Sequence, residues 1–522
     1  MKPIVWILPT FLVSLTASTV AAQTPAIAPA EARAAHAYDD ARAQGPEALR
    51  AFLTGFPKGA DLHVHLSGAV YAETFLREAG EDGLCVDPEA LALVKPPCNG
   101  KFFPASELGG NITPARQVIY DKMIDSLSMR GFVPSAGWTG HDQFFATFGR
   151  FGGLKKEHAP EWVDEVAARA AAQNQQYLEI MQTPPFSHAA RIGYQIGWPT
   201  GEPDFAALRQ KLLDAGLRDE VATNRQEMLA AETGRKALEH CGGPQATPAC
   251  QVEIRYLYQI LRGNPPEQVF AQTLLGFETV SAALKDQEKT FVGINFVQPE
   301  DGLISMRDYT LQMHMLAYLH SVYPQVHLSL HAGELVEGMV PPEGMRFHIR
   351  QAVELAHAER IGHGVDVMHE DKACVLLKEM AEKHVMVEIN LSSNEGILGV
   401  KGTAHPFPLY RAAHVPVALS TDDEGVSRID LTREYVRAAF DYGLSYNELK
   451  TLARTGIAHS FLPGADLWAT PDNFSALGAA CKSDPTGSEH PSAACAQLLQ
   501  TSEKAAAEWE LEHRFRNFEA QW

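Results

Sequence analysis

The chain has 522 residues, of which 45% are hydrophobic, so it can bury a large core. Its formal net charge of −20 at pH 7 argues against electrostatic binding to nucleic acid or to an anionic membrane surface. We therefore expect no nucleic-acid or membrane partner, and a small neutral or cationic ligand instead.

The first 22 residues have the pattern of a signal peptide. Lys2 precedes an apolar stretch from Ile4 to Leu15, and small residues then lead to a cleavage site after Ala22. The apolar stretch is too short to span a bilayer as a helix, and the alternative is a retained N-terminal anchor. We expect the mature protein to be exported, to the periplasm or as a secreted protein.

Export to an oxidising compartment changes what the seven cysteines indicate. Six of them permit several connectivities, and we predict disulfides between sequence neighbours because each pair brackets a loop that carries Pro or Gly: Cys85–Cys98, Cys241–Cys250 and Cys481–Cys495. Cys374 lies in an apolar pattern and is predicted to be a buried free thiol.

The elements predicted in chain order alternate between strands and helices. Residues 23–56 form a linker and one or two helices, and eight strands follow: Asp61–His65, Gln176–Met181, Glu253–Tyr258, Thr290–Phe296, His327–His331, Arg360–Gly364, Val385–Asn390 and Pro416–Ser420. Helical patterns separate most of them, such as Glu161–Ala172, Met306–Val322, Ile349–Ala358 and Lys372–Lys383. This alternation predicts an α/β protein with a (β/α)₈ TIM barrel over residues 57–470.

Two connections in this barrel are longer than a crossover needs. They follow the first and second strands, over Leu66–Gln175 and Met181–Val252. Insertions of this length commonly build lids or interfaces, and the first one carries the aromatic cluster Phe144–Phe148. Residues 471–522 are predicted to be a C-terminal loop and helix.

Four motifs place His or Asp at the ends of predicted strands: Asp61-Leu62-His63-Val64-His65, His331-Ala332-Gly333-Glu334, Gly362-His363-Gly364 and Ser420-Thr421-Asp422-Asp423. Residues i and i+2 of a strand point to the same side, and the carboxyl ends of barrel strands converge on one face. We therefore predict one Zn²⁺ per subunit, with another divalent metal possible, held by His63, His65, His331 and Asp422.

The other polar residues of these motifs suit acid–base work beside a metal. Glu334 is placed to protonate the substrate, and His363 to act as the base or the orienter of the attacking water. Asp423 is placed to hydrogen-bond the substrate. The structural alternatives are a capping role for Glu334, a helix N-terminal role for Asp423 and an ordinary barrel position for His363.

With these motifs the chain resembles the metal-dependent adenosine deaminases, and its leader and insertions resemble the secreted, growth-factor-type branch. The resemblance covers about Pro57 to Arg428 and includes Asn390-Leu391-Ser392-Ser393-Asn394 and His405-Pro406-Phe407-Pro408-Leu409. It implies that zinc-activated water deaminates adenosine, or a related 6-aminopurine nucleoside, to inosine and ammonia. Glu334 would then protonate N1, His363 would handle the water proton, and Asp423 would contact N7.

The chain departs from the family pattern at three positions. Ser67 stands where the family often has an acid that holds the ribose, and Gln298 stands where a glycine approaches the purine N3. Glu424 replaces a proline after the paired aspartates. Ser67, Gln298 and Asp423 are our candidate substrate-binding residues.

Two other functions remain open from the sequence. The first is another metal-dependent amidohydrolase of the same barrel fold, acting on a different amine, amide or lactone. The second is a secreted, non-catalytic binding or signalling protein. We also expect a homodimer, formed through the N-terminal helices or the Leu66–Gln175 insertion, because both are longer than the barrel needs.

Overall fold

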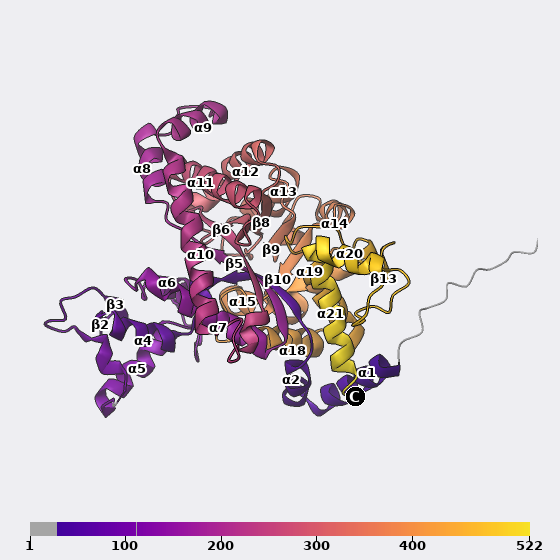
Figure 1. Ribbon diagram of the computed structural model, residues 1–522. Coiled ribbons are helices and arrows are strands. Elements are labelled where there is room, and N and C mark those ends of the chain that lie inside the picture. The colour runs from indigo at the N-terminus through magenta and orange to yellow at the C-terminus, as the bar shows by residue number, and fades with distance from the viewer. Residues whose placement is uncertain (1–28, 111) are drawn as a thin grey trace, which may run out of the picture.

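A parallel barrel of eight strands forms the centre of the protein (Figure 1). The computed structural model describes residues 29–110 and 112–522, so the expected signal peptide lies outside it. An isolated parallel bridge between Val64 and Asp422 closes the last strand onto the first. The predicted (β/α)₈ barrel is confirmed, with all eight strands in the predicted places: β1 (Gly59–His65), β5 (Gln175–Gln182), β6 (Glu253–Leu261), β7 (Phe291–Val297), β8 (His327–Ala332), β9 (Arg360–His363), β10 (Met386–Ile389) and β11 (Val417–Leu419).

Helices surround this barrel and bury its outer face. The strands are largely buried on both faces, and every residue of β1 and β7 is buried, as expected for a parallel sheet covered by helices. The four helical patterns named from the sequence are confirmed as α7, α12, α13 and α14. The covering helices are α7 (Ala159–Ala172), α11 (Pro266–Lys285), α12 (Leu303–Val322), α13 (His348–Glu354), α14 (Ala373–Glu382), α15 (Leu391–Leu398), α16 (Phe407–Ala412), α18 (Leu431–Asp441) and α19 (Tyr446–Ala458).

The insertion after β1 has a small core of its own and projects from the barrel, at the left of Figure 1. It contains α3 (Leu66–Ala69), α4 (Ala72–Glu81), the strands β2 (Cys85–Asp87), β3 (Ala92–Val94) and β4 (Phe103–Pro104), α5 (Pro114–Ser126) and α6 (Gly140–Phe148). The last of these helices returns to the barrel, where Phe144 packs with Ile397 and Val426.

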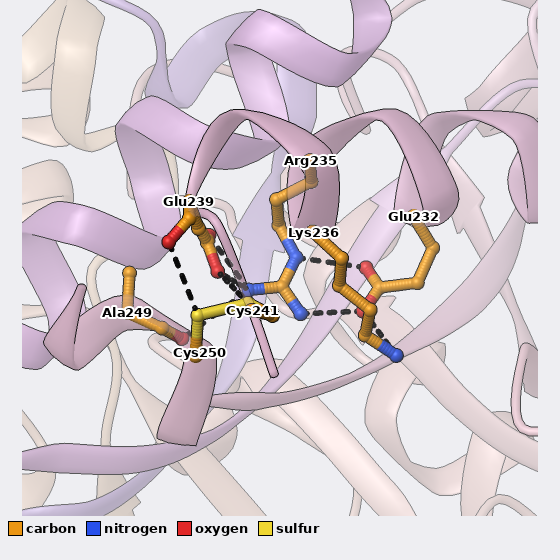
Figure 2. The surroundings of a disulfide bond; sticks show 7 residues. All are labelled: Glu232, Arg235, Lys236, Glu239, Cys241, Ala249 and Cys250. Carbon is orange, nitrogen blue, oxygen red and sulfur yellow. Dashed lines mark hydrogen bonds and ion pairs between the residues drawn. A yellow bond between two sulfur atoms is a disulfide. The ribbon is translucent and has the colours of Figure 1, made fainter. Parts of the chain in front are cut away.

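The insertion after β5 is helical and ends in a disulfide loop. It contains α8 (Ser187–Ile196), α9 (Phe205–Asp214) and α10 (Val221–Leu238). Figure 2 shows how Arg235, 1% exposed, lies between Glu232 and Glu239 beside the Cys241–Cys250 disulfide. The Arg235 guanidinium also donates to the Ala249 carbonyl at 3.2 Å, so it ties the end of α10 to the returning chain.

The two ends of the described chain pack together below the barrel, where α1 and the C-terminus lie side by side in Figure 1. Arg33 donates to the Trp522 carbonyl, and Phe52 packs edge-on against Phe518. The elements of the two ends are α1 (Pro29–Gln44), α2 (Pro46–Thr54), β12 (Trp468–Thr470), β13 (Asn473–Leu477), α20 (Ala493–Thr501) and α21 (Glu503–Glu519), whereas α17 (Glu424–Ser427) directly follows β11. The expected boundary at residue 470 falls inside the β12–β13 hairpin.

All three predicted disulfides are present: Cys85–Cys98, Cys241–Cys250 and Cys481–Cys495. Cys374 is free as predicted, but the prediction that it is buried is wrong. The buried face of α14 is formed by Leu376, Leu377 and Met380, and Cys374 lies outside this face in the first turn of the same helix. Within residues 29–110 and 112–522, no helix is both long and apolar enough to cross a membrane.

Candidate metal and catalytic site

The four predicted metal ligands come together at the carboxyl ends of the barrel strands. The Nε2 atom of His65 lies 3.2 Å from that of His331 and 3.3 Å from Asp422 Oδ1. His63 Nε2 lies 3.5 Å from the same carboxylate oxygen. Each of these four residues is at least nine-tenths buried. The geometry therefore brings three imidazoles and a carboxylate from β1, β8 and the end of β11 to one point.

His363 joins the same cluster from the end of β9. Ligand atoms of His63, His331, His363 and Asp422 all lie within 4.8 Å of one another. Both His363 and Asp422 have positive φ angles, 70° and 61°, a conformation that residues with a side chain seldom adopt. Such strain is common where a side chain must be aimed at a reacting centre.

Oxygen atoms behind the cluster fix how three of the imidazoles present themselves. Each of these rings donates its Nδ1–H to a side-chain oxygen, so its Nε2 lone pair faces the centre of the cluster. The pairs are His63 with Glu388 at 2.6 Å, His65 with Gln259 at 2.8 Å and His331 with Asn295 at 2.7 Å. The Nε2 atom of His63 is buried and has no hydrogen-bond partner among the described residues. This donor set fits a bound metal ion.

The charges of the cluster shift several pKa values. Burial alone would raise the pKa of Asp422, but hydrogen bonds and charges from His63 and His65 hold it well below its usual range. Burial opposes the protonation of His63, but Asp422 and Glu388 raise its pKa to about 10, so a metal ion must displace the Nε2 proton when it binds here. Burial, together with the neighbouring histidines, lowers the pKa of His331 far below its usual value. Asp422 is therefore ionised and His331 is neutral, the forms that bind a metal.

The pKa values of Glu334 and Asp423 are raised, in contrast to that of Asp422. Burial, followed by the charges of Asp422 and Glu300, raises the pKa of Glu334 well above its usual value. Burial raises the pKa of Asp423 to about 8. Burial thus favours the protonated form of both groups, and neither Glu334 Oε1 nor Asp423 Oδ1 has a hydrogen-bond partner among the described residues. They can donate protons or hydrogen bonds to a bound molecule.

A cavity of about 340 Å³ opens beside the cluster. The predicted substrate-binding residues Ser67, Gln298 and Asp423 all line it, together with Glu334 and His363. Gln298 has a φ of 86°, and its side-chain oxygen accepts the Gly263 N–H at 2.7 Å. Glu424, the third departure from the family pattern, is instead buried in an ion pair with Arg169.

Several residues that shape this site were not among the candidate site residues, although the aromatic cluster Phe144–Phe148 was noted in the sequence. Phe144, Phe145 and Phe148 of α6 form an apolar wall of the cavity, so the first insertion contributes directly to it. Glu300 accepts the backbone N–H groups of Gly333 and Glu334 at 2.9 and 2.7 Å and so fixes the loop after β8. Polar residues inside predicted buried strands, such as Asn295 and Glu388, were a signal that could have indicated the oxygen atoms behind the cluster.

The fold and this site define the class of the protein. It is a (β/α)₈ barrel whose strands carry, at their carboxyl ends, a His/Asp cluster that could hold a metal ion. The comparison with protein families is more specific. A family model described as adenosine deaminase matches residues 155–467, more than half of the chain, so the chain belongs to the adenosine deaminase family.

The curated relatives match over shorter stretches. The adenosine deaminase of Clostridium acetobutylicum is 32% identical over 157 residues, which are 30% of this chain and 43% of the relative. That of Enterococcus faecalis is 36% identical over 138 residues, 26% of this chain and 37% of the relative. The matched part of the chain thus spans less than half the length of these relatives.

Solved structures share the fold over most of both chains. The adenine deaminase of Arthrobacter aurescens has a TM-score of 0.50 and 18% identity, covering 78% of this chain and 94% of its own. The N6-mAMP deaminase of Arabidopsis has a TM-score of 0.51 and 22% identity, covering 79% of this chain and 95% of its own. At these identities the likeness establishes the barrel architecture alone.

Proposed function

We propose that the protein is a zinc-dependent deaminase that hydrolyses adenosine, or a related 6-aminopurine nucleoside, to inosine and ammonia. The observation that carries this proposal is the position of the neutral acids Glu334 and Asp423, which line one cavity beside the His/Asp cluster. Membership of the adenosine deaminase family supports the reaction class. The family comparison begins at residue 155, after the motif that contains His63 and His65, so the ligand set rests on geometry.

His63, His65, His331 and Asp422 are the proposed zinc ligands. Their buried lone pairs and carboxylate give the N₃O donor set that Zn²⁺ favours, and the orphaned Nε2 of His63 is the clearest sign of a missing partner. When bound, the ion would supply Lewis acidity that lowers the pKa of a water molecule toward neutrality.

The chain's own residues handle the purine. Glu334, held as an acid by burial, donates its proton to the ring nitrogen N1, which makes C6 more electrophilic. Asp423, also protonated near pH 7, donates a hydrogen bond to N7 and fixes the ring orientation. Burial lowers the pKa of His363 to about 3, so this imidazole is neutral and orients the attacking water oxygen. The apolar wall on α6 excludes bulk water from the reacting atoms.

The cavity lining favours an uncharged substrate. Within the described part of the chain, no Lys or Arg lines the cavity, and the lining includes the ionised carboxylate of Asp422. A phosphate group would need basic or backbone donors to replace its hydration. The proposal is therefore a nucleoside or base deaminase, although a structural neighbour is an N6-mAMP deaminase.

Ammonia release from a substrate panel tests this proposal. The metal-replete protein would be assayed with adenosine, 2′-deoxyadenosine, adenine and AMP, and in parallel with an amide and lactone panel. We expect turnover of at least one nucleoside and little turnover of AMP. Hydrolysis of a lactone with no ammonia from any purine would identify a different amidohydrolase, and a zinc-loaded protein inert on every substrate would favour a binding or signalling role.

We also propose that the protein is exported and that it resembles the secreted branch of the family. The leader-like pattern of residues 1–22 and the three disulfides support this location, because disulfides persist in oxidising compartments. N-terminal sequencing of the protein from fractionated cells would test it. Mature protein beginning near Gln23 outside the cytoplasm is the expected result, and an intact leader on cytoplasmic protein would contradict it.

A further inference from the structure

His405 and Asn394 form a hydrogen-bonded chain that ends at Nδ1 of His363. Asn394 belongs to α15, and His405 precedes α16, so three separate segments meet here. His405 is 2% exposed, and Asn394 and His363 are fully buried. Neither His405 nor Asn394 lines the cavity or contributes a ligand atom to the metal cluster.

Hydrogen bonds run in one direction through these residues. The backbone N–H of Phe407 donates to His405 Nδ1 at 3.1 Å, so a neutral His405 carries its proton on Nε2. That Nε2–H donates to Asn394 Oδ1 at 3.0 Å, which fixes the orientation of the amide. The Asn394 NH₂ group then faces His363 Nδ1 at 2.9 Å and donates to it. Burial lowers the pKa of His405 to about 4, in keeping with a neutral ring.

The tautomer of His363 is opposite to that of the three histidines proposed as metal ligands. His63, His65 and His331 donate from Nδ1 to oxygen atoms and leave Nε2 as a lone pair. His363 accepts at Nδ1, from Asn394 and also from the Asn390 amide at 3.3 Å, so its proton is on Nε2. The Nε2 atom of His363 is buried without a partner among the described residues. A ring in this form can donate a hydrogen bond from Nε2 but cannot ligate a metal through that atom.

We propose that His405 and Asn394 are positioning residues that fix His363 as its Nε2–H tautomer. His363 is thereby kept out of the metal's ligand set, although its ring lies as close to the cluster as those of the proposed ligands. The consequence for catalysis, a hydrogen bond from Nε2–H to the water oxygen, rests on the proposed function. The tautomer itself does not depend on it.

The test reverses the last hydrogen bond with Asn394→Asp in the full, zinc-loaded chain. The carboxylate accepts from His363 Nδ1, so the proton moves there and Nε2 becomes a lone pair. Long-range ¹H–¹⁵N correlation spectra of ¹⁵N-histidine protein, assigned with His363→Gln, report the tautomer directly. We expect the Nε2–H form in the wild type, the Nδ1–H form in Asn394→Asp, and a kcat for adenosine lower by about 100-fold with a KM changed less than about threefold.

Two comparisons separate this effect from general damage. Asn224→Asp places a carboxyl at another fully buried asparagine, on α10, whose amide donates to Tyr258, and should leave the His363 tautomer and kcat unchanged. His405→Gln keeps a donor toward Asn394 and should lose less kcat than His405→Leu, which removes it. These two variants decide the matter if Asn394→Asp does not fold.

The inference is wrong if wild-type His363 carries its proton on Nδ1, or if Asn394→Asp leaves both the tautomer and kcat unchanged. It is also wrong if His405→Gln and His405→Leu behave alike. A protein inactive on every purine whose His363 tautomer still changes in Asn394→Asp would refute the proposed function and leave this inference standing.

Discussion

Asp423 lies so close to Gly68 that a Cβ atom on the glycine would stand 1.4 Å from Asp423 Oδ1. Gly68 belongs to α3, directly after β1, whereas Asp423 follows β11. The contact therefore joins the segment after the first barrel strand to the segment after the last one. The missing side chain at position 68 is what allows the proposed N7 donor to occupy its place.

Gly68→Ala should displace Asp423 and weaken nucleoside binding. We expect the KM for adenosine to rise by about tenfold or more, because one hydrogen bond to the substrate is worth about 1.5 kcal/mol when a charged or acidic partner is involved. Zinc content should stay unchanged. Gly152→Ala is the matched control, since its added Cβ would meet nothing within 4 Å. Equal KM values for the two variants would contradict the placement of Asp423.

Removing the metal should abolish deamination reversibly. Dialysis against a chelator is expected to give inactive, folded protein, and added Zn²⁺ should restore the activity. Asp422→Asn should lower zinc affinity by much more than tenfold, because the amide supplies no charge to balance the cation. Elemental analysis and chelator competition measure both effects. Full activity in metal-free protein would refute the metal-dependent reaction.

Glu334→Gln should leave a folded, zinc-bound protein that turns over slowly. The substitution keeps the shape of the side chain and removes the proton that we assign to N1. We expect kcat to fall by about 10²- to 10⁴-fold with a small change in KM. Steady-state kinetics with adenosine, alongside zinc analysis, measure this. A kcat within threefold of wild type would exclude Glu334 as the proton donor.

Glu508 in α21 should make the protein less stable in alkaline solution. Burial raises its pKa to about 8, although the hydrogen bond that the Leu467 N–H donates to its carboxylate lowers the pKa in part. The folded pKa exceeds the unfolded one, so its stability contribution is complete below about pH 4.5 and is lost as pH rises through about 8.

Glu508→Gln should therefore gain stability relative to wild type as pH increases from 5 to 9, by up to about 4 kcal/mol. Thermal unfolding across that pH range measures the difference. Glu510→Gln, on an exposed part of the same helix near Arg514, provides the control. Parallel curves for Glu508→Gln and wild type would show that Glu508 titrates normally.

Light scattering at micromolar concentration should find a homodimer. The N-terminal helices pack on α18 and α21, where Phe440 is 50% exposed and Trp522 is 44% exposed. The projecting insertion also exposes Val133 and Trp138. Apolar side chains exposed in this way are typical of contact surfaces when they gather in a patch. A monomer at that concentration would refute self-association.

The barrel was predictable from the sequence because parallel strands are continuous apolar runs bounded by chemically distinct ends. The His63/His65 spacing and the paired aspartates indicated the catalytic end of the barrel, because these polar residues stand at the ends of such strands. The position of Glu388 in a buried strand was a signal, but which histidine Glu388 or Gln259 would contact was not predictable, since these contacts join strands far apart in the chain. The aromatic cluster Phe144–Phe148 was noticed, but periodicity alone could not show which cavity it would cover.

The bridge that closes the barrel joins Val64 to Asp422. Val64 lies between the proposed ligands His63 and His65, and Asp422 is the fourth proposed ligand. The N–H of Asp422 donates to the His63 carbonyl at 2.8 Å, and its own carbonyl accepts from His65. A cation held there would link the first and last strands of the barrel. Its binding would therefore stabilise the closed barrel, and a chain in which these two strands had not met would have no assembled site to offer.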